Sequence, residues 1–143
     1  MADYKKVLVA IDGSEESGKI VARAAQIAAA NNAELSAALV FEPLLGSYSY
    51  ELNMGDFEKV QKEHQARVAE KARESLAAQG VPAARVHFLS GKPATEIKKL
   101  VASSATDLLV IGSHGHSPLR AVLGSTANAV LHGISCDVLT VRV

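Results

Sequence analysis

The segment Leu108–Thr126, LLVIGSHGHSPLRAVLGST, decides the fold and the candidate site of this 143-residue chain. It begins with four apolar residues, which are typical of a strand buried on both faces. Gly112, Gly115 and Gly124 follow, and glycines permit backbone conformations and close approaches that other residues resist. Consecutive free N–H groups form a positively polarised concavity, and a helix starting at Ser125 would direct more of them to the same place. We therefore expect either a phosphate-binding loop or, without a ligand, a tight strand-to-helix turn.

The composition favours one soluble domain, which we expect to span residues 1–143. Apolar residues make up 48% and charged residues 21%, as in an ordinary globular protein. Fifteen basic and fifteen acidic residues cancel, which argues against nucleic acid as the main partner. No apolar run approaches the ~20 residues that cross a membrane, and Met1–Lys6 does not resemble a signal peptide. With Cys136 as its single cysteine, the chain has no internal disulfide, and a cytoplasmic location is the simplest interpretation.

Apolar runs alternate with segments of helical spacing along the whole chain. The runs predict five strands, over Lys6–Ile11, Glu34–Phe41, Arg85–Leu89, Asp107–Ile111 and Cys136–Val143. The helical spacing predicts four helices, over residues 14–31, 56–79, 93 onward and 125–132. Strict alternation indicates an α/β protein with a mainly parallel sheet covered by helices on both sides.

Several local features refine this pattern. Ser14, followed by two glutamates, is expected to be the N-cap of the first helix. The long second helix carries a thin apolar stripe that includes Val60, with His64 at its boundary. The preceding loop, Pro43–Gly55, is long for a compact domain. It has two interpretations, a lid over a site or a surface excursion without a role.

Two loops leave the carboxyl ends of strands with suitable chemistry for a ligand. One carries Asp12, Gly13 and Ser14, and the other is the glycine-rich segment after the fourth strand. Open α/β sheets bind ligands at this edge, near the point where the strand order reverses. If the first and fourth strands are neighbours, the two loops flank one crevice, with a carboxylate toward a ribose or base and N–H groups toward phosphates. The spacing matches neither a P-loop nor a dinucleotide-binding fingerprint.

The whole chain resembles the universal stress protein family. The likeness rests on VLVAIDGSEES near the start, and on DLLVIGSHGHS and LGSTANAVLHGISCDVLTVRV in the closing half. The family's nucleotide signature is Gly, two residues, Gly, about nine residues, Gly, then Ser or Thr. Gly112, Gly115, Gly124 and Ser125 follow it here with a second gap of eight residues, His116–Leu123. The resemblance implies a three-layer sandwich of the adenine nucleotide alpha hydrolase-like class, with a five-stranded parallel sheet ordered 3-2-1-4-5.

The resemblance also implies a ligand, ATP, with Mg²⁺ brought in by its phosphates. Carried over by position, the backbone of Ala10 and Ile11 and the carboxylate of Asp12 would meet the adenosine, and Val40 would line the base. The phosphate-binding set would be Gly112, His114, Gly115, His116, Gly124, Ser125 and Thr126. A basic residue often follows the second glycine in the family, whereas this chain has His116, and a histidine of ordinary pKa is mostly neutral at pH 7. This departure leaves an AMP-like ligand as an alternative.

Other readings of the same residues are weaker. His114 and His116 have the spacing of a metal pair, but no third ligand accompanies them, so we expect no metal held by protein alone. Ser125 lacks the elbow motif of a hydrolase, and no general base or arginine finger is evident, so at most a slow ATPase is expected. Cys136 is interpreted as a packed thiol.

In the last expected strand, Val138, Thr140 and Arg142 alternate with the apolar Leu139, Val141 and Val143. This strand is expected at a sheet edge, at the terminus of the chain. An open edge invites pairing with another chain, and the family resemblance also implies a homodimer. We therefore expect a homodimer formed through Val138–Val143. The alternative to a nucleotide-binding stress-response protein is a dimeric interaction or scaffold protein of the same fold that binds no nucleotide.

Overall fold

The computed structural model describes residues 3–42, 54–113 and 125–143 of the chain. Its strands lie close to their predicted positions. They are β1 (Lys6–Ile11), β2 (Glu34–Phe41), β3 (Val86–Ser90), β4 (Leu108–Gly112) and β5 (Asp137–Val141). The helices are α1 (Ser17–Asn31), α2 (Met54–Ala78), α3 (Pro93–Ser104) and α4 (Ser125–Leu131), with a short 3₁₀ turn, η2 (Ala83–Arg85), before β3.

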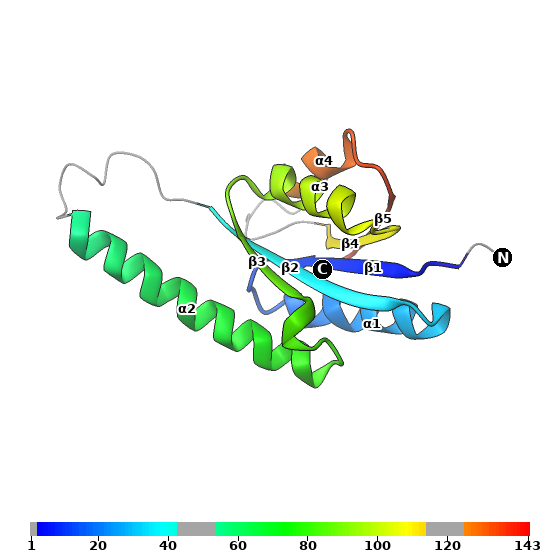
Figure 1. Cartoon of the computed structure of the whole chain (residues 1–143), viewed down its shortest axis with the longest axis horizontal. Coiled ribbons are helices and arrows are strands. Elements are labelled where there is room, and N and C mark those ends of the chain that lie inside the picture. Colours follow the sequence, from blue (N-terminus) through cyan, green and yellow to red (C-terminus); the bar gives the residue numbers. More distant parts are fainter. Residues whose placement is uncertain (1–2, 43–53, 114–124) are drawn as a thin grey trace.

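The five strands form one parallel sheet in the order β3-β2-β1-β4-β5. This is the predicted order, and Figure 1 shows β1 in the middle of the sheet. Val9 pairs with Ala37 of β2 on one side and with Val110 of β4 on the other. The strand order therefore reverses at β1, which places the carboxyl ends of β1 and β4 next to each other.

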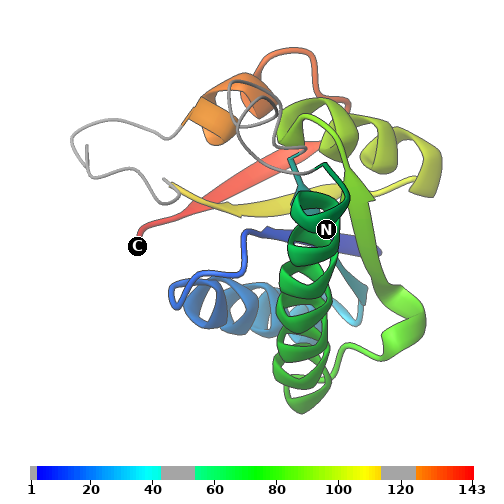
Figure 2. The same cartoon turned by 90° about the vertical axis from the view of Figure 1, so that its left-hand side faces the viewer.

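In the described part of the chain, α1 and α2 cover one face of the sheet and α3 and α4 cover the other, which gives three layers (Figures 1 and 2). The layer of α1 and α2 buries Ile20, Val21 and Leu76 against the odd-numbered residues of β1. The layer of α3 and α4 buries Ile97, Val101 and Val130 against the even-numbered ones. Because β1 faces a core on both sides, its interior residues are all apolar.

The boundaries of α1 show which local signals acted. Asn32 adopts the left-handed conformation, with φ of 54°, and its N–H bonds the carbonyls of Ala28 and Ala29, so the helix ends where the sequence predicted. The prediction that Ser14 caps the start is wrong. The N-cap position is Glu16, which makes no side-chain capping bond. Ser14 lies in the turn before it, where its carbonyl accepts a hydrogen bond from the N–H of Ser17 at 3.1 Å.

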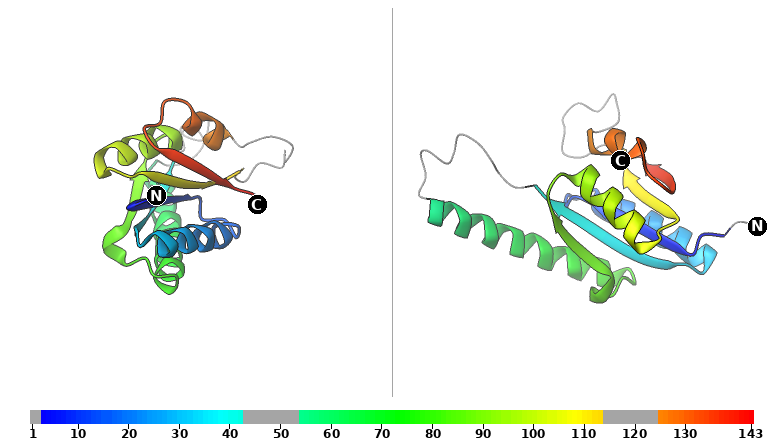
Figure 3. Two further views of the ribbon diagram at one scale, coloured as in Figure 1. Left: turned by 90° about the vertical axis from the view of Figure 1, so that its right-hand side faces the viewer. Right: turned by 45° about the horizontal axis from the view of Figure 1, so that its top comes forward.

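The long helix α2 is only partly packed on the sheet. Ala69, Ala72 and Leu76 are buried, whereas Val60 is 62% exposed and His64 is exposed. The predicted stripe is therefore wrong at Val60 and at His64. The reason is visible in Figure 1 and in the right panel of Figure 3, where the first part of α2 extends past the end of β2.

Side-chain contacts fix the second half of α2 at β3. The guanidinium carbon of Arg73 lies 4.7 Å from the centre of the Phe88 ring, a cation–π distance. Phe88 also stacks on Phe41, with ring centres 6.2 Å apart.

Among the residues that the structure describes, no helix is long and apolar enough to cross a membrane.

Candidate functional site

The carboxyl ends of β1 and β4 lie side by side, as expected from the sequence. Val9 pairs with Val110, and two positions further along each strand are Ile11 and Gly112, the last residues of β1 and β4. Asp12 follows one of them and Ser113 the other. The turn that carries Asp12 and the segment that carries the glycines thus leave adjacent strands at the same edge of the sheet.

The carboxylate of Asp12 is held in place by the turn that follows it. Its Oδ1 accepts hydrogen bonds from the backbone N–H of Ser14 at 2.9 Å and from the hydroxyl of Ser17 at 3.2 Å. Ser17 is the first residue of α1 and is 8% exposed. A buried hydroxyl needs a partner, so this bond fixes both Ser17 and the orientation of the carboxylate. Asp12 itself is exposed.

The same turn depends on Gly13. Its φ is +82°, a conformation that side chains with a Cβ rarely adopt. A Cβ at this position would also lie 3.1 Å from Cγ1 of Val68 on α2. Gly13 therefore allows the turn after β1, which begins with Asp12, to lie close to Val68 of α2.

The other residues predicted to meet the adenosine lie on two faces of the sheet. Ala10 is buried in the core under α3 and α4, and Val40 packs against that same core. Ile11 packs against the opposite core. Ala10 and Val40 thus share one face near the carboxyl edge, whereas Ile11 can offer that face only its backbone, which is the role that the family resemblance gave it.

The C-terminal end of the chain is tied to the start of the glycine-rich segment. The N–H of Ser113 donates to the carbonyl of Val141 at 2.8 Å, and the N–H of Val143 donates to Oγ of Ser113 at 3.4 Å. Gly112 pairs with Val141 within the sheet. The position of residue 113 is therefore set by β5 and the two residues beyond it.

Four predicted residues, His114, Gly115, His116 and Gly124, lie outside the described residues. Ser125 and Thr126 open α4, and Thr126 is half-buried directly before the buried Ala127. The part of the chain that the structure describes contains no group of three or more His, Cys, Asp or Glu side chains placed to hold a metal ion.

Sequence reasoning missed two positioning residues, Ser17 and Ser113. Ser17 carried a signal, because it is a small polar residue at the start of an apolar helix face, five positions after the aspartate. Ser113 carried none, since its partner Val143 is thirty positions away along the chain.

Cys136 is half-buried, and it packs against the core under α3 and α4. Its Sγ lies 3.3 Å from the carbonyl oxygen of Asp137. Burial raises the pKa of the Cys136 thiol above its ordinary value, and the nearby negative charge of Asp137 adds to this. The thiol is thus kept protonated, in agreement with its interpretation as a packing residue.

Together these features define a class. A five-stranded parallel sheet in the order 3-2-1-4-5, between two helix layers, is the adenine nucleotide alpha hydrolase-like fold, and the two loops lie at its strand-order reversal. A sequence profile of the universal stress protein family matches residues 3–142. The chain belongs to the universal stress protein family.

Individual relatives agree with this assignment. The chain is 38% identical over 142 residues to Universal stress protein A homolog 1 of Coxiella burnetii, with 96% of each protein covered. It is 34% identical over 148 residues to Universal stress protein YxiE of Bacillus subtilis, with coverage of 97% of this chain and 99% of that one. A solved universal stress protein in complex with cAMP superposes with a TM-score of 0.70 and 28% identity, covering 99% of this chain and 98% of its own.

Proposed function

We propose that this protein is a cytoplasmic stress-response protein that binds ATP, or another adenine nucleotide, in a crevice between the Asp12 turn and the glycine-rich segment. The observation that carries the proposal is the adjacency of β1 and β4, together with the Asp12 carboxylate oriented by Ser14 and Ser17. The solved relative in complex with cAMP supports an adenine nucleotide as the class of ligand.

Each part of the nucleotide has a matching group in this proposal. The backbone of Ala10 and Ile11 and the carboxylate of Asp12 recognise the adenosine, because a fixed carboxylate accepts hydrogen bonds from ribose hydroxyls. Val40, on the same face as Ala10, supplies apolar contact to the base. The phosphate-binding set is Gly112, His114, Gly115, His116, Gly124, Ser125 and Thr126. Mg²⁺ would enter with the phosphates, since it binds readily to phosphate oxygens and water.

Binding rather than rapid turnover is the proposed activity. Phosphoryl transfer depends on charges positioned around the transferred group, and the described site residues provide a carboxylate and backbone rather than a set of cations. Any ATP hydrolysis is expected to be slow. The nucleotide would instead stabilise one arrangement of the carboxyl-edge loops, and a partner protein would recognise that arrangement.

A homodimer through the C-terminal strand is part of the proposal. In the described structure β5 pairs with β4 on one side and has no strand on the other, and Figure 3 shows it at the edge of the sheet. The strand itself ends at Val141, so Arg142 and Val143 of the predicted segment lie beyond it. An open edge of this kind is available to the same strand of a second copy.

The test is isothermal titration calorimetry with ATP and AMP, with and without Mg²⁺, on the wild-type protein and two variants. Asp12→Asn keeps the oxygen that bonds Ser14 and Ser17 but removes the charge. We expect affinity to fall about 10- to 100-fold, since a hydrogen bond to a charged group contributes roughly 1.5–3 kcal/mol. Glu15→Gln removes the same charge from an exposed neighbour and should change affinity less than twofold. No binding by folded wild-type protein at millimolar nucleotide would refute the proposal.

The second candidate is a scaffold protein of the same fold that binds no nucleotide. The open edge of β5 favours it, because that edge provides an interaction surface that needs no ligand. Mass spectrometry of the denatured, freshly purified protein separates the two, since a nucleotide-binding protein is expected to release a bound nucleotide. If Gly115→Val leaves ligand content and affinity unchanged, the glycine-rich segment is not the phosphate site.

A further inference from the structure

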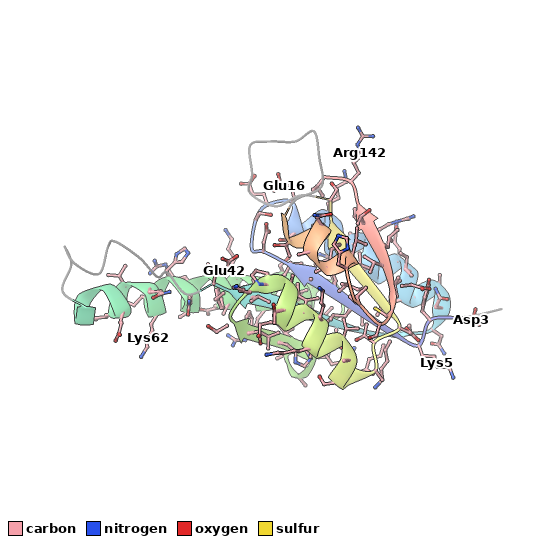
Figure 4. All side chains as sticks on the ribbon, turned by 90° about the horizontal axis from the view of Figure 1, so that it is seen from above. Asp3, Lys5, Glu16, Glu42, Lys62 and Arg142 are labelled. Atoms are coloured by element: carbon pink, nitrogen blue, oxygen red, sulfur yellow. The ribbon has the colours of Figure 1, made fainter. Side chains whose placement is uncertain are left out.

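A second candidate site lies at the opposite edge of the sheet, where the strands begin. A cavity of about 200 Å³ is bounded by the first residues of β1, β2 and β3 and by the end of α3. Its lining consists of Lys6, Val7, Leu8, Glu34, Ser36, Ala84, Arg85, His87, Leu100, Ser104 and Thr106, all of them described residues. We call it the amino-edge groove. In Figure 4, Asp3 and Lys5 mark the start of β1, and Glu16 marks the other edge.

The strand register explains why these side chains meet. Lys6 pairs with Glu34 and Leu8 pairs with Ser36, so their side chains point to the same face of the sheet. His87 pairs with Ala38, which continues that face onto β3. The face is the one that α3 covers, but α3 ends at Ser104. The groove is therefore a place where three strands begin beneath the last turn of a helix.

The charged groups of the groove are arranged around Arg85. Its Nε donates to the carbonyl of Leu35 at 2.8 Å and lies 3.8 Å from Oε1 of Glu34. These contacts anchor the side chain, which is only 35% exposed. Within residues 3–42, 54–113 and 125–143, no group accepts a hydrogen bond from its two terminal nitrogens. A guanidinium held by Nε thus presents its remaining donors to a ligand.

Lys6 adds a second cation on the other side of the groove. Its Nζ donates to the carbonyl of Ser104 at 3.3 Å, which uses one of its three N–H bonds. With Glu34 balanced by Arg85, the lining keeps an excess positive charge. Ser36 and His87 have no side-chain hydrogen bond to any described residue, so both can bond to a ligand.

Apolar side chains make up another part of the lining, beside the polar Ser104 and Thr106, and they bear on the size and character of the ligand. Ala84 and Leu100 expose this surface, whereas Leu8 is buried beneath it and Val7 faces the opposite core. An apolar cavity of roughly 150 Å³ holds a benzene-sized molecule, so this groove has room for such a body and one attached polar group. A planar carboxylate matches the donors of a guanidinium in pairs.

We propose that the amino-edge groove binds a small organic carboxylate of about the size of benzoate, with its carboxylate on Arg85 and its apolar body against Ala84 and Leu100. The site is independent of the proposed nucleotide crevice, because the two lie at opposite ends of the strands. A protein with both sites could respond to an acid metabolite and to a nucleotide through one sheet.

The experiment is a titration of the ¹⁵N-labelled full chain, followed by amide chemical shifts, with benzoate as the probe. Benzamide is the matched neutral compound and has nearly the same shape. We expect benzoate to cause saturable shifts at Lys6, Ser36, His87 and Ser104, with half-saturation in the low millimolar range or below. Benzamide should bind at least tenfold more weakly, because it lacks the charge that Arg85 recognises.

Two variants test the role of the guanidinium. Arg85→Gln should weaken benzoate binding at least tenfold. Arg23→Gln, which removes the same group from the exposed face of α1 on the other side of the sheet, should leave it unchanged. If Arg85→Gln does not fold, Ser36→Ala provides a milder test and should weaken binding severalfold.

Three results would overturn the proposal. The first is the absence of saturable shifts in the wild-type protein up to 50 mM benzoate. The second is equal binding of benzoate and benzamide, which would show that charge is not recognised. The third is inorganic phosphate binding at the same residues more tightly than benzoate, which would indicate a bare oxyanion site without a role for the apolar lining. Nucleotide binding at the other edge has no bearing on any of them.

Discussion

The backbone N–H of Val143 donates a hydrogen bond to Oγ of Ser113 at 3.4 Å. These two residues join the end of the chain to the residue that follows β4, and the Ser113 N–H bonds Val141 in the same place. The edge strand proposed for dimerisation thus lies beside Gly112 and Ser113, where the segment proposed for phosphate binding begins. A substitution that alters one of these two regions is expected to alter the structure of the other.

Ser113→Ala tests this connection. The variant loses the side-chain bond to Val143, which is expected to cost about 0.5–1.5 kcal/mol of stability. Hydrogen exchange of the Val143 amide should become faster, while exchange in the middle of β1 stays slow. Urea denaturation and amide exchange by NMR are the measurements. Unchanged exchange at Val143 would show that the bond does not hold the chain end in solution.

Gly13→Ala should destabilise the protein through the turn after β1. The alanine would have to adopt a φ of +82°, and its Cβ would lie 3.1 Å from Cγ1 of Val68. We expect a loss of about 1–2 kcal/mol, in line with the cost of a left-handed conformation for an ordinary residue. Urea denaturation measures it.

Gly18→Ala is the matched control for that change. Gly18 lies in α1 and does not have a positive φ, and a Cβ added there would meet no heavy atom within 4 Å. Alanine is favoured over glycine in a helix by up to about 1 kcal/mol, so this variant should be at least as stable as the wild type. Equal effects of the two changes would contradict the role given to Gly13.

Leu76→Ala and Val60→Ala separate the packed half of α2 from its projecting half. Leu76 is 1% exposed within the core under the sheet, and its truncation should cost about 2–5 kcal/mol. Val60 is 62% exposed, and its truncation should stay within about 0.5 kcal/mol. Urea denaturation of both variants checks the pair. A large loss of stability in Val60→Ala would mean that a partner covers this side chain.

The pH dependence of Cys136 alkylation should be shifted to higher pH. Burial raises the pKa of its thiol, so the rate with iodoacetamide should rise at higher pH than for a free cysteine in a peptide. Since the folded pKa is the higher one, the folded state holds this proton more tightly. Its contribution to stability is full below the unfolded pKa and is lost as the pH rises through the folded pKa. A rate profile that matches the peptide would contradict the burial.

The sequence predicted the sheet well because its signals are dense there. The apolar runs at Lys6–Ile11 and Glu34–Phe41 coincide with β1 and β2. A strand that is buried on both faces needs an almost continuous run of apolar residues, and such a run is easy to recognise in a sequence. The strand order came from the family resemblance, because no local pattern states which strand pairs with which.

Features that depend on distant contacts were not predictable in the same way. Ser14 has the residue type of a helix cap, but α1 starts at Ser17, and the backbone N–H of Ser14 bonds the Asp12 carboxylate in the turn before it. Val60 fits a helical stripe, but the sheet ends before it and leaves it exposed. The amino-edge groove joins residues from β1, β2, β3 and α3, and its members show no common spacing along the chain.

The central position of β1 also governs how the chain can fold during synthesis. β1 precedes the other described strands along the chain, and it can pair with β2 soon after both are made. Its other edge, at Val7, Leu8 and Val9, remains unpaired until β4 has been made, and β4 begins only at residue 108. Until then a growing chain carries an apolar strand edge that any similar strand can pair with. A product cut short before residue 108 would keep that edge permanently, so premature termination is expected to give aggregation rather than a smaller folded protein.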